Sequence, residues 1–363
     1  MRLRIFLALS MAAALGACAS PKPVPLDTIT SAAAASPDPA ASEARLKALL
    51  ADEQRLNDVF GRLVTSNADL CGADYVPAFG LRLWSIDDFA ETTKAAAAAA
   101  FGVDERLQVY AVADGQPAAA AGVKPGDILK TVEGKALAEG AEGRRQFAEG
   151  VTAGLLKNGA VRFTFLRGKK SVKVRLKALK SCPFAVALAV GDDPNAATDG
   201  TTVFVTTGML DFATQDRDLA TVLGHEIAHA IRGDAQIKAD PAKPRRTGAG
   251  RFVGAVIDAA TGVGDAAFEV LGLSSARRNS VAAEVASDRL GLYLAARAGY
   301  DVSAAPDIWR RLDKEYPSAS DGGWTHPSHA DRYTVMQETA AEIAAKRAAG
   351  EALIPDPEAS PQS

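Results

Sequence analysis

The stretch LATVLGHEIAHAIRGD (219–234) constrains this chain more than any other part of its sequence. His225 and His229 are four residues apart, so on a helix they lie one turn apart on the same face, and both imidazoles can reach one metal ion. Their neighbours are uncharged, which makes an unpaired imidazole costly in this position. Glu226 can lean over the same site and accept a proton without binding the metal. We therefore expect a helix that carries a metal centre.

The chain contains only four histidines, and they fall into two short clusters. The second cluster is WTHPSHADR (324–332), which contains His326 and His329. Two clusters favour a shared functional site over a chance pattern. Two histidines on one helix do not hold a catalytic metal by themselves, so a third ligand is needed. A histidine six positions after His229 is one common solution, but Ala235 occupies that position.

A carboxylate on a later helix is the other common third ligand. In VAAEVASDRLGLYLAARAGYD (281–301), Glu284 and Asp288 are four residues apart, on one face of a helix that is otherwise mostly apolar. Glu284 is the expected ligand, and Asp288 is the expected acceptor for the free N–H of a ligand histidine. The rival carboxylates have more polar neighbours and are Glu269, Glu315 and Glu338.

Four segments resemble the zinc metallopeptidase family of HtpX and the CAAX prenyl endopeptidase, above all its soluble periplasmic branch of the BepA and LoiP type. In chain order they are TTGML, DLATVLGHEIAHAIRGD, AAEVASDRLGLYLAARAGYD and THPSHADR, within roughly residues 184–340. The resemblance implies one Zn²⁺ per chain, held by His225, His229 and Glu284. It also implies Glu226 as the general base and Asp288 as the residue that supports a ligand.

The turn of the second histidine cluster also matches the family. The match implies that His326 or Arg332 approaches the metal, either to stabilise the oxyanion of the reaction or to block the open metal position at rest. Both roles stay open for both residues, while His329 is expected at the surface. The substrate is expected to add as a strand along a sheet edge formed by Val203, Phe204, Val205, Thr206 and Thr207.

The beginning of the chain has the form of a secretory signal. Residues 1–17 combine an arginine-containing start with an apolar stretch that is short for a membrane span. LGAC (15–18) resembles a bacterial lipobox, which implies lipidation of Cys18; an ordinary cleaved signal is the alternative. Ala19 after the cysteine favours the periplasmic face of the outer membrane of a Gram-negative bacterium. Residues 18–42, rich in Pro, Ala and Ser, are expected to form a flexible tether.

Two further cysteines, Cys71 and Cys182, are expected to form a disulfide in such an oxidising compartment, and buried free thiols are the alternative. Between them the sequence alternates like strands near 79–84 and 106–112, predicts a helix near 139–157, and ends in a strand pair over 161–176. PAAAAGVKPGDIL (117–129) resembles the most recognisable stretch of bacterial PDZ domains. We expect a PDZ-like domain over 71–182, either capturing peptide ends or serving as a spacer.

The remaining segments complete an α+β fold. A helix is expected over 43–70, and a mainly helical zincin-type metallopeptidase domain with a small sheet over 183–345. Residues 346–363 are expected to be disordered. The apolar stretch 252–273 is long enough to span a bilayer, but its acidic residues and glycines favour an amphipathic hairpin beside the site.

The charge balance excludes one class of partner. The net charge is −3 with acids and bases interleaved, which does not suit a nucleic-acid-binding protein. The sequence therefore predicts a zinc endopeptidase that acts on envelope polypeptides in protein quality control and is held to the membrane by a lipid anchor. The alternative is a zinc-dependent chaperone or assembly factor for outer-membrane proteins that rarely cleaves.

Overall fold

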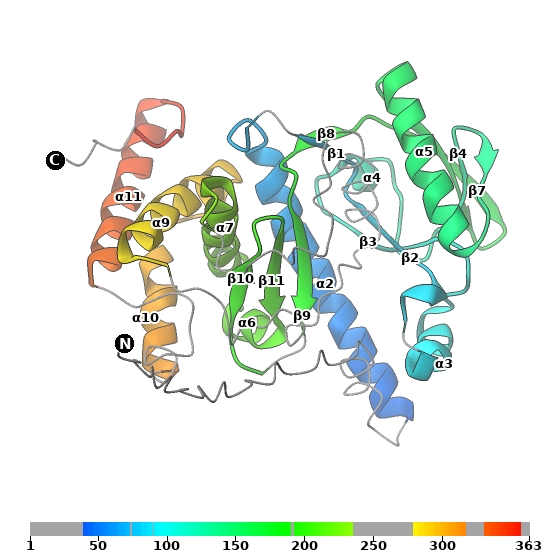
Figure 1. The fold of residues 1–363 in the computed structure, drawn as a ribbon, viewed down its shortest axis with the longest axis horizontal. Coiled ribbons are helices and arrows are strands. Elements are labelled where there is room, and N and C mark those ends of the chain that lie inside the picture. The colour runs from blue at the N-terminus through cyan, green and yellow to red at the C-terminus, as the bar shows by residue number, and fades with distance from the viewer. Residues whose placement is uncertain are drawn as a thin grey trace, which may run out of the picture.

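The computed structural model describes residues 39–72, 75–89, 91–189, 192–234, 279–316 and 330–356. Several expectations lie outside these residues: the signal, Cys18, most of the tether, the stretch 252–273, Glu269, His326 and His329. The described chain has helices and strands in two units beside a long helix, α2 (Pro39–Ser66) (Figure 1). The mixture of helix and sheet confirms the α+β class.

The first unit is built on one antiparallel sheet. Its strand order is β2 (Leu81–Trp84), β3 (Gln108–Val112), β4 (Ile128–Val132), β6 (Val161–Arg167) and β7 (Lys170–Leu176), with β5 (Lys135–Ala136) beside β4. Helices α3 (Glu91–Phe101), α4 (Pro117–Ala120) and α5 (Gly140–Asn158) complete it. Alternate residues of β6 are buried, as the pleat of a one-sided strand requires. The expected strands and helix are therefore present.

The second unit combines a small sheet with helices. The sheet order is β10 (Ala196–Thr198), β11 (Thr202–Thr206) and β9 (Ala185–Ala189). The helices are α6 (Thr207–Phe212), α7 (Asp216–Arg232), α9 (Val281–Arg297), α10 (Ala305–Glu315) and α11 (Ala330–Ala349).

The position of β11 corrects one expectation. β11 is the central strand, paired antiparallel with β10 and parallel with β9. The expectation that Val203–Thr207 forms an exposed sheet edge is therefore wrong, because both sides of this strand already have partners. Thr207 has left the strand and begins α6, where Thr206 caps the helix by accepting a hydrogen bond from the Met209 backbone N–H.

Helix α2 contacts the two units through different kinds of side chain. Its apolar residues, including Leu56 and Phe60, belong to the core of the second unit. Its hydrogen bonds with the first unit come from polar side chains. Gln54 exchanges two hydrogen bonds with the backbone of Val112, and Asp58 accepts one from the Asp114 N–H. The two cores thus remain separate while α2 contacts both units.

The first unit is joined to the rest of the chain through a narrow connection. Strand β1 (Val76–Ala78) pairs with β8 (Leu179–Ser181), and just outside this pair Cys71 and Cys182 form a disulfide with Cα atoms 5.4 Å apart.

Replacing both cysteines with alanine is expected to lower the free energy of unfolding by about 4 kcal/mol, because the bond closes a loop of 111 residues and restricts the unfolded chain. Urea denaturation with and without reductant measures this. Reductant should shift the wild-type midpoint and leave that of the double variant in place. An equal shift in both would show that the disulfide does not contribute.

The C-terminal end is more ordered than expected. Helix α11 continues to Ala349, and the Lys346 ammonium donates to the Ile354 carbonyl at 2.7 Å. Arg297 reaches the Leu353 carbonyl at 3.3 Å. The expectation of disorder from residue 346 is therefore wrong for 346–356, because these backbone groups find side-chain partners. Within the described residues, no helix combines the length and apolarity that a membrane span requires.

Candidate metal centre

Helix α7 carries the two histidines and is well formed at both ends. Asp216 and Asp218 lie in its first turn, where they interact favourably with the positive end of the helix dipole. Gly233 ends the helix with φ 77°, a conformation that favours glycine. Between these ends the helix is buried, and His225, Glu226 and His229 are at most 1% exposed.

A close crossing of glycines brings α9 onto α7. A Cβ atom on Gly224 would lie 2.6 Å from the backbone oxygen of Gly291, and one on Gly291 would lie 2.7 Å from the His225 nitrogen. Only glycine on both helices allows the backbones to approach so closely. Glu284 lies two turns before Gly291 on α9, so the crossing brings its carboxylate to the histidines.

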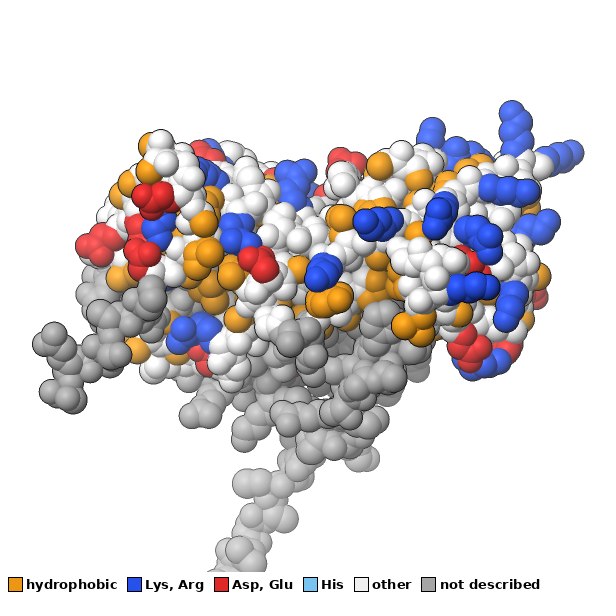
Figure 2. All heavy atoms as spheres, turned by 90° about the horizontal axis from the view of Figure 1, so that it is seen from above, with side chains coloured by type: hydrophobic (Ala, Val, Ile, Leu, Met, Phe, Trp, Pro, Cys, Tyr) orange, Lys and Arg blue, Asp and Glu red, His pale blue; other side chains and the backbone are white. Residues whose placement is uncertain are grey.

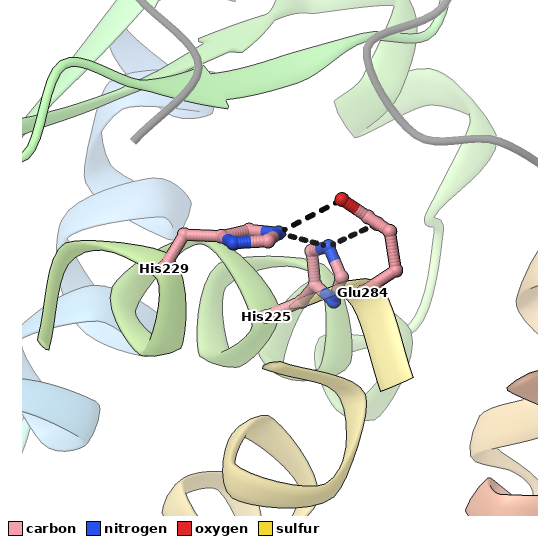
Figure 3. A group of neighbouring side chains, drawn as sticks. All are labelled: His225, His229 and Glu284. Atoms are coloured by element: carbon pink, nitrogen blue, oxygen red, sulfur yellow. Dashed lines mark hydrogen bonds and ion pairs between the residues drawn. The ribbon is translucent and has the colours of Figure 1, made fainter. Parts of the chain in front are cut away.

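Three buried side chains converge at this crossing (Figure 3). The Nε2 atoms of His225 and His229 are 3.0 Å apart, and each lies 3.3 Å from a carboxylate oxygen of Glu284. A tetrahedral zinc with bonds of ~2.0–2.1 Å separates its ligand atoms by roughly 3.3 Å. The two histidines approach different oxygens of Glu284: His225 lies near Oε2 and His229 near Oε1. One ligand atom from each of the three residues lies within 4.8 Å of the other two, so the group can hold one ion.

The other ring nitrogens indicate which atoms remain available to a metal. Asp288 Oδ1 lies 2.8 Å from Nδ1 of His225, and Asp234 Oδ1 lies 2.8 Å from Nδ1 of His229. A carboxylate at Nδ1 favours the proton on that nitrogen, which leaves the lone pair on Nε2. Two lone pairs and a carboxylate oxygen then face one another in a buried site. A metal cation satisfies that arrangement, so the residues fit a zinc ion.

Arg332 on α11 lies behind this centre. Its Nε and Nη2 donate to the two carboxylate oxygens of Asp288 at 2.7 and 2.8 Å, and its Nη1 lies 3.4 Å from Glu284. Burial alone would raise the pKa of Asp288, but the guanidinium outweighs it and holds the pKa below its usual range. These contacts favour Arg332 as a positioning residue for the α9 carboxylates, beside the two expected roles of stabilising the oxyanion or blocking the open metal position.

Asp234 is a site residue that the sequence analysis missed. It follows the glycine that ends α7, and the chain turns back there so that the carboxylate reaches His229. Ser287 Oγ lies 3.0 Å from the same Nδ1 atom. A usable signal existed, since a carboxylate directly after a helix-ending glycine can contact the last turn. Each ligand histidine thus has its own aspartate.

Replacing Asp234 with asparagine is expected to weaken zinc binding by about 10- to 100-fold, because the amide no longer fixes the His229 ring as a carboxylate does. Competition with a chromogenic chelator measures the affinity. Asp307→Asn, in the exposed first turn of α10, removes the same charge elsewhere and should bind zinc like the wild type. Equal affinities in all three proteins would show that Asp234 does not support the ligand.

The rival carboxylates within the described residues do not join the centre. Glu315 at the end of α10 and Glu338 on α11 are both exposed, whereas Glu284 is fully buried. Of the described residues, one group of acidic, histidine or cysteine side chains is arranged to hold a metal ion, and it consists of His225, His229 and Glu284.

A His-Glu-x-x-His helix and a glutamate from a following helix define a metallopeptidase. Residues 168–340 match the model of peptidase family M48, which agrees with the family resemblance and supports a metalloendopeptidase. In an alignment of 146 residues that covers 36% of this chain, the chain is 31% identical to the mitochondrial metalloendopeptidase OMA1 of Bos taurus. In an alignment of 143 residues that covers 37% of the chain, it is 30% identical to a Vibrio cholerae protein described as a beta-barrel assembly-enhancing protease. The matches span 27% and 29% of those proteins.

Proposed function

We propose that the chain is a zinc-dependent endopeptidase that cleaves polypeptides of the bacterial cell envelope in protein quality control. The observation that carries the proposal is the buried group of His225, His229 and Glu284, whose three ligand atoms lie within 4.8 Å of one another. Proteolysis follows from the family, and the description of the Vibrio cholerae relative supports the envelope. Lipidation of Cys18 on the periplasmic face of the outer membrane remains a sequence-based part of this proposal.

In this proposal the residues of the centre have separate roles. His225, His229 and Glu284 hold the zinc ion, which when bound supplies a Lewis acid that activates water and polarises a peptide carbonyl. Asp288 and Asp234 keep the histidine rings in the orientation and tautomer that binding requires. Glu226, buried beside His225, accepts the proton of the attacking water and returns it to the leaving amine.

Replacing Glu226 with glutamine is expected to lower peptidase activity by roughly 10²- to 10⁴-fold while zinc stays bound, because the amide cannot carry the proton. Cleavage of an unfolded protein substrate and zinc content are measured on the same preparation. Glu338→Gln, on an exposed position of α11, is the matched control and should cleave like the wild type. Full activity of the Glu226 variant with zinc bound would refute the assignment.

The second candidate is a zinc-dependent chaperone or assembly factor. The observation that favours it is the first unit, which has its own core apart from the metal centre. In that case the Glu226→Gln variant would still support envelope function in cells that lack the wild-type protein. Loss of function in that variant favours the endopeptidase.

We also propose that the unit between Cys71 and Cys182 is PDZ-like. The loop before β2, which would receive a peptide end, supports a spacer role more than capture. A Cβ on Gly80 would lie 2.1 Å from Cβ of Gln116, so the Gln116 side chain already fills the space beside this loop. The Gln116 amide also donates to Thr65 on α2 at 3.0 Å.

A further inference from the structure

The segment KNGAVRFTFLRGKKSVKVRLKALK (157–180) contains nine lysines and arginines and no aspartate or glutamate. The net charge of the whole chain is −3, so all other residues together carry −12. Acids and bases are therefore not interleaved here, contrary to what the overall balance indicates. The segment runs from the end of α5 through β6 and β7 to β8.

The fold sorts this segment into a buried and an exposed side. Val161, Phe163 and Phe165 are buried in the core of the first unit. The exposed basic residues of the β6–β7 hairpin and the turn after it, which we call the basic face, are Arg162, Lys169, Lys170, Lys173, Arg175 and Lys177. Figure 2 shows Lys and Arg side chains gathered at the end of the molecule that holds α5 and β7.

The basic face is poorly neutralised within the described residues. Arg162 pairs with Glu133 at 3.0 Å, but the structure records no acidic partner for the other five cations in the parts of the chain that it describes. Arg162 also lies directly opposite Arg175 in the strand register, and like charges in that position are destabilising. Glu133 offsets part of this repulsion through its ion pair with Arg162, and an anionic surface would relieve the rest.

Exposed apolar side chains are close to these charges in the sequence. Four large hydrophobic residues are exposed in the described chain; Leu156, at 85%, directly precedes the basic segment, and Leu179, at 42%, lies near its end. Leucines among lysines are typical of surfaces that enter the headgroup region of a bilayer. A third, Tyr75, already lies under the Lys180 ammonium, 4.3 Å from the ring centre.

A simpler explanation accounts for only part of this pattern. β7 is an edge strand, and lysines on an edge strand prevent pairing with other chains. That explains Lys170 and Lys173. It does not explain Arg162 on β6, which is an inner strand, or the absence of acids throughout the segment.

We propose that the basic face docks on an anionic lipid surface. Lysine predominates over arginine, which suits diffuse attraction to lipid headgroups more than bidentate contacts with phosphates. Single-stranded nucleic acid would require exposed aromatic rings for stacking, but the aromatic residues of the segment, Phe163 and Phe165, are buried. The proposal concerns binding alone and is independent of peptidase activity.

The test measures how much phosphatidylglycerol strengthens binding of the full chain to vesicles, relative to vesicles of phosphatidylcholine alone. Any binding through the N-terminal segment contributes to both kinds of vesicle and is removed by this comparison. Each cation near an anionic surface contributes about 1 kcal/mol, so K170Q/K173Q/R175Q should weaken the phosphatidylglycerol-dependent part on the order of 100-fold. The control K47Q/R310Q/K314Q removes three positive charges from α2 and α10 and should bind like the wild type.

The outcomes separate clearly. High salt should abolish the increase in vesicle binding that phosphatidylglycerol produces in the wild type, because the attraction is electrostatic. The proposal would be overturned if phosphatidylglycerol did not strengthen binding of the wild type, or if both triple variants lost the same amount of phosphatidylglycerol-dependent binding. Binding to a DNA duplex without any gain on anionic vesicles would also overturn it and assign the face to nucleic acid. Thermal melting and peptidase activity of the first triple variant confirm that it folds.

Discussion

Glu284→Gln is expected to leave the purified chain without zinc, while the wild type holds about one zinc ion. The substitution keeps the size of the side chain and removes its charge. The neutral amide oxygen that remains is a much weaker zinc ligand than a carboxylate, and because Glu284 is fully buried, water cannot take its place without opening the crossing of α7 and α9. Loss of a residue that hydrogen-bonds a metal ligand already weakens metal binding by up to about 100-fold. Loss of the ligand itself should weaken zinc binding further. Elemental analysis after dialysis, followed by chelator competition, measures the effect.

The matched controls are the two exposed rivals, Glu315→Gln and Glu338→Gln, which should retain zinc. If the Glu284 variant kept zinc as tightly as the wild type while a rival lost it, the third ligand would be that rival. A parallel measurement of unfolding separates loss of metal from loss of fold.

Gly291→Ala is expected to destabilise the protein at the crossing of α7 and α9. The new Cβ would lie 2.7 Å from the His225 nitrogen and 2.9 Å from the Gly224 carbonyl carbon. Both are backbone atoms, so a rotamer change cannot relieve the overlap and the helices must move apart. Overpacking of this kind costs about 1–3 kcal/mol. Zinc affinity should fall as well, because the same movement carries Glu284 away from the histidines.

The control for this prediction is Gly61→Ala on α2. A Cβ there would have its nearest neighbour, Ala113, at an ordinary 3.5 Å. Alanine is the better helix former by about 1 kcal/mol, so this variant should be as stable as the wild type or more stable. Urea denaturation of zinc-loaded proteins compares the two. A Gly291 variant as stable as the Gly61 variant would show that the crossing is not tightly packed.

Local spacing explains what the sequence predicted well. His225, His229, Glu284 and Asp288 follow helical periodicity, and a helix places such residues on one face wherever it lies in the fold. The strands and the helix of the first unit could be predicted for the same reason. These features depend on neighbours within a few residues.

The missed features depend on contacts between elements. The central position of β11 required knowing that the short, alanine-rich β10 is a strand, and nothing in its three residues has a strand pattern. The contact of Asp234 with His229 is an exception, because it is local and depends on the left-handed turn at Gly233, for which the sequence does contain a signal. Arg332 reaches Asp288 only because α11 lies beside α9, and sequence periodicity contains no information on which helices meet.

The disulfide at Cys71 and Cys182 has an evolutionary consequence. The chain leaves the peptidase part and returns to it at almost the same point, because the two Cα atoms are 5.4 Å apart. Helix α2 keeps its apolar residues for the peptidase core and presents polar groups to the intervening unit. A gene that lost or exchanged that unit would therefore leave α2 and β9 in place, joined by a short turn. The unit can thus diversify while selection on the metal centre continues unchanged.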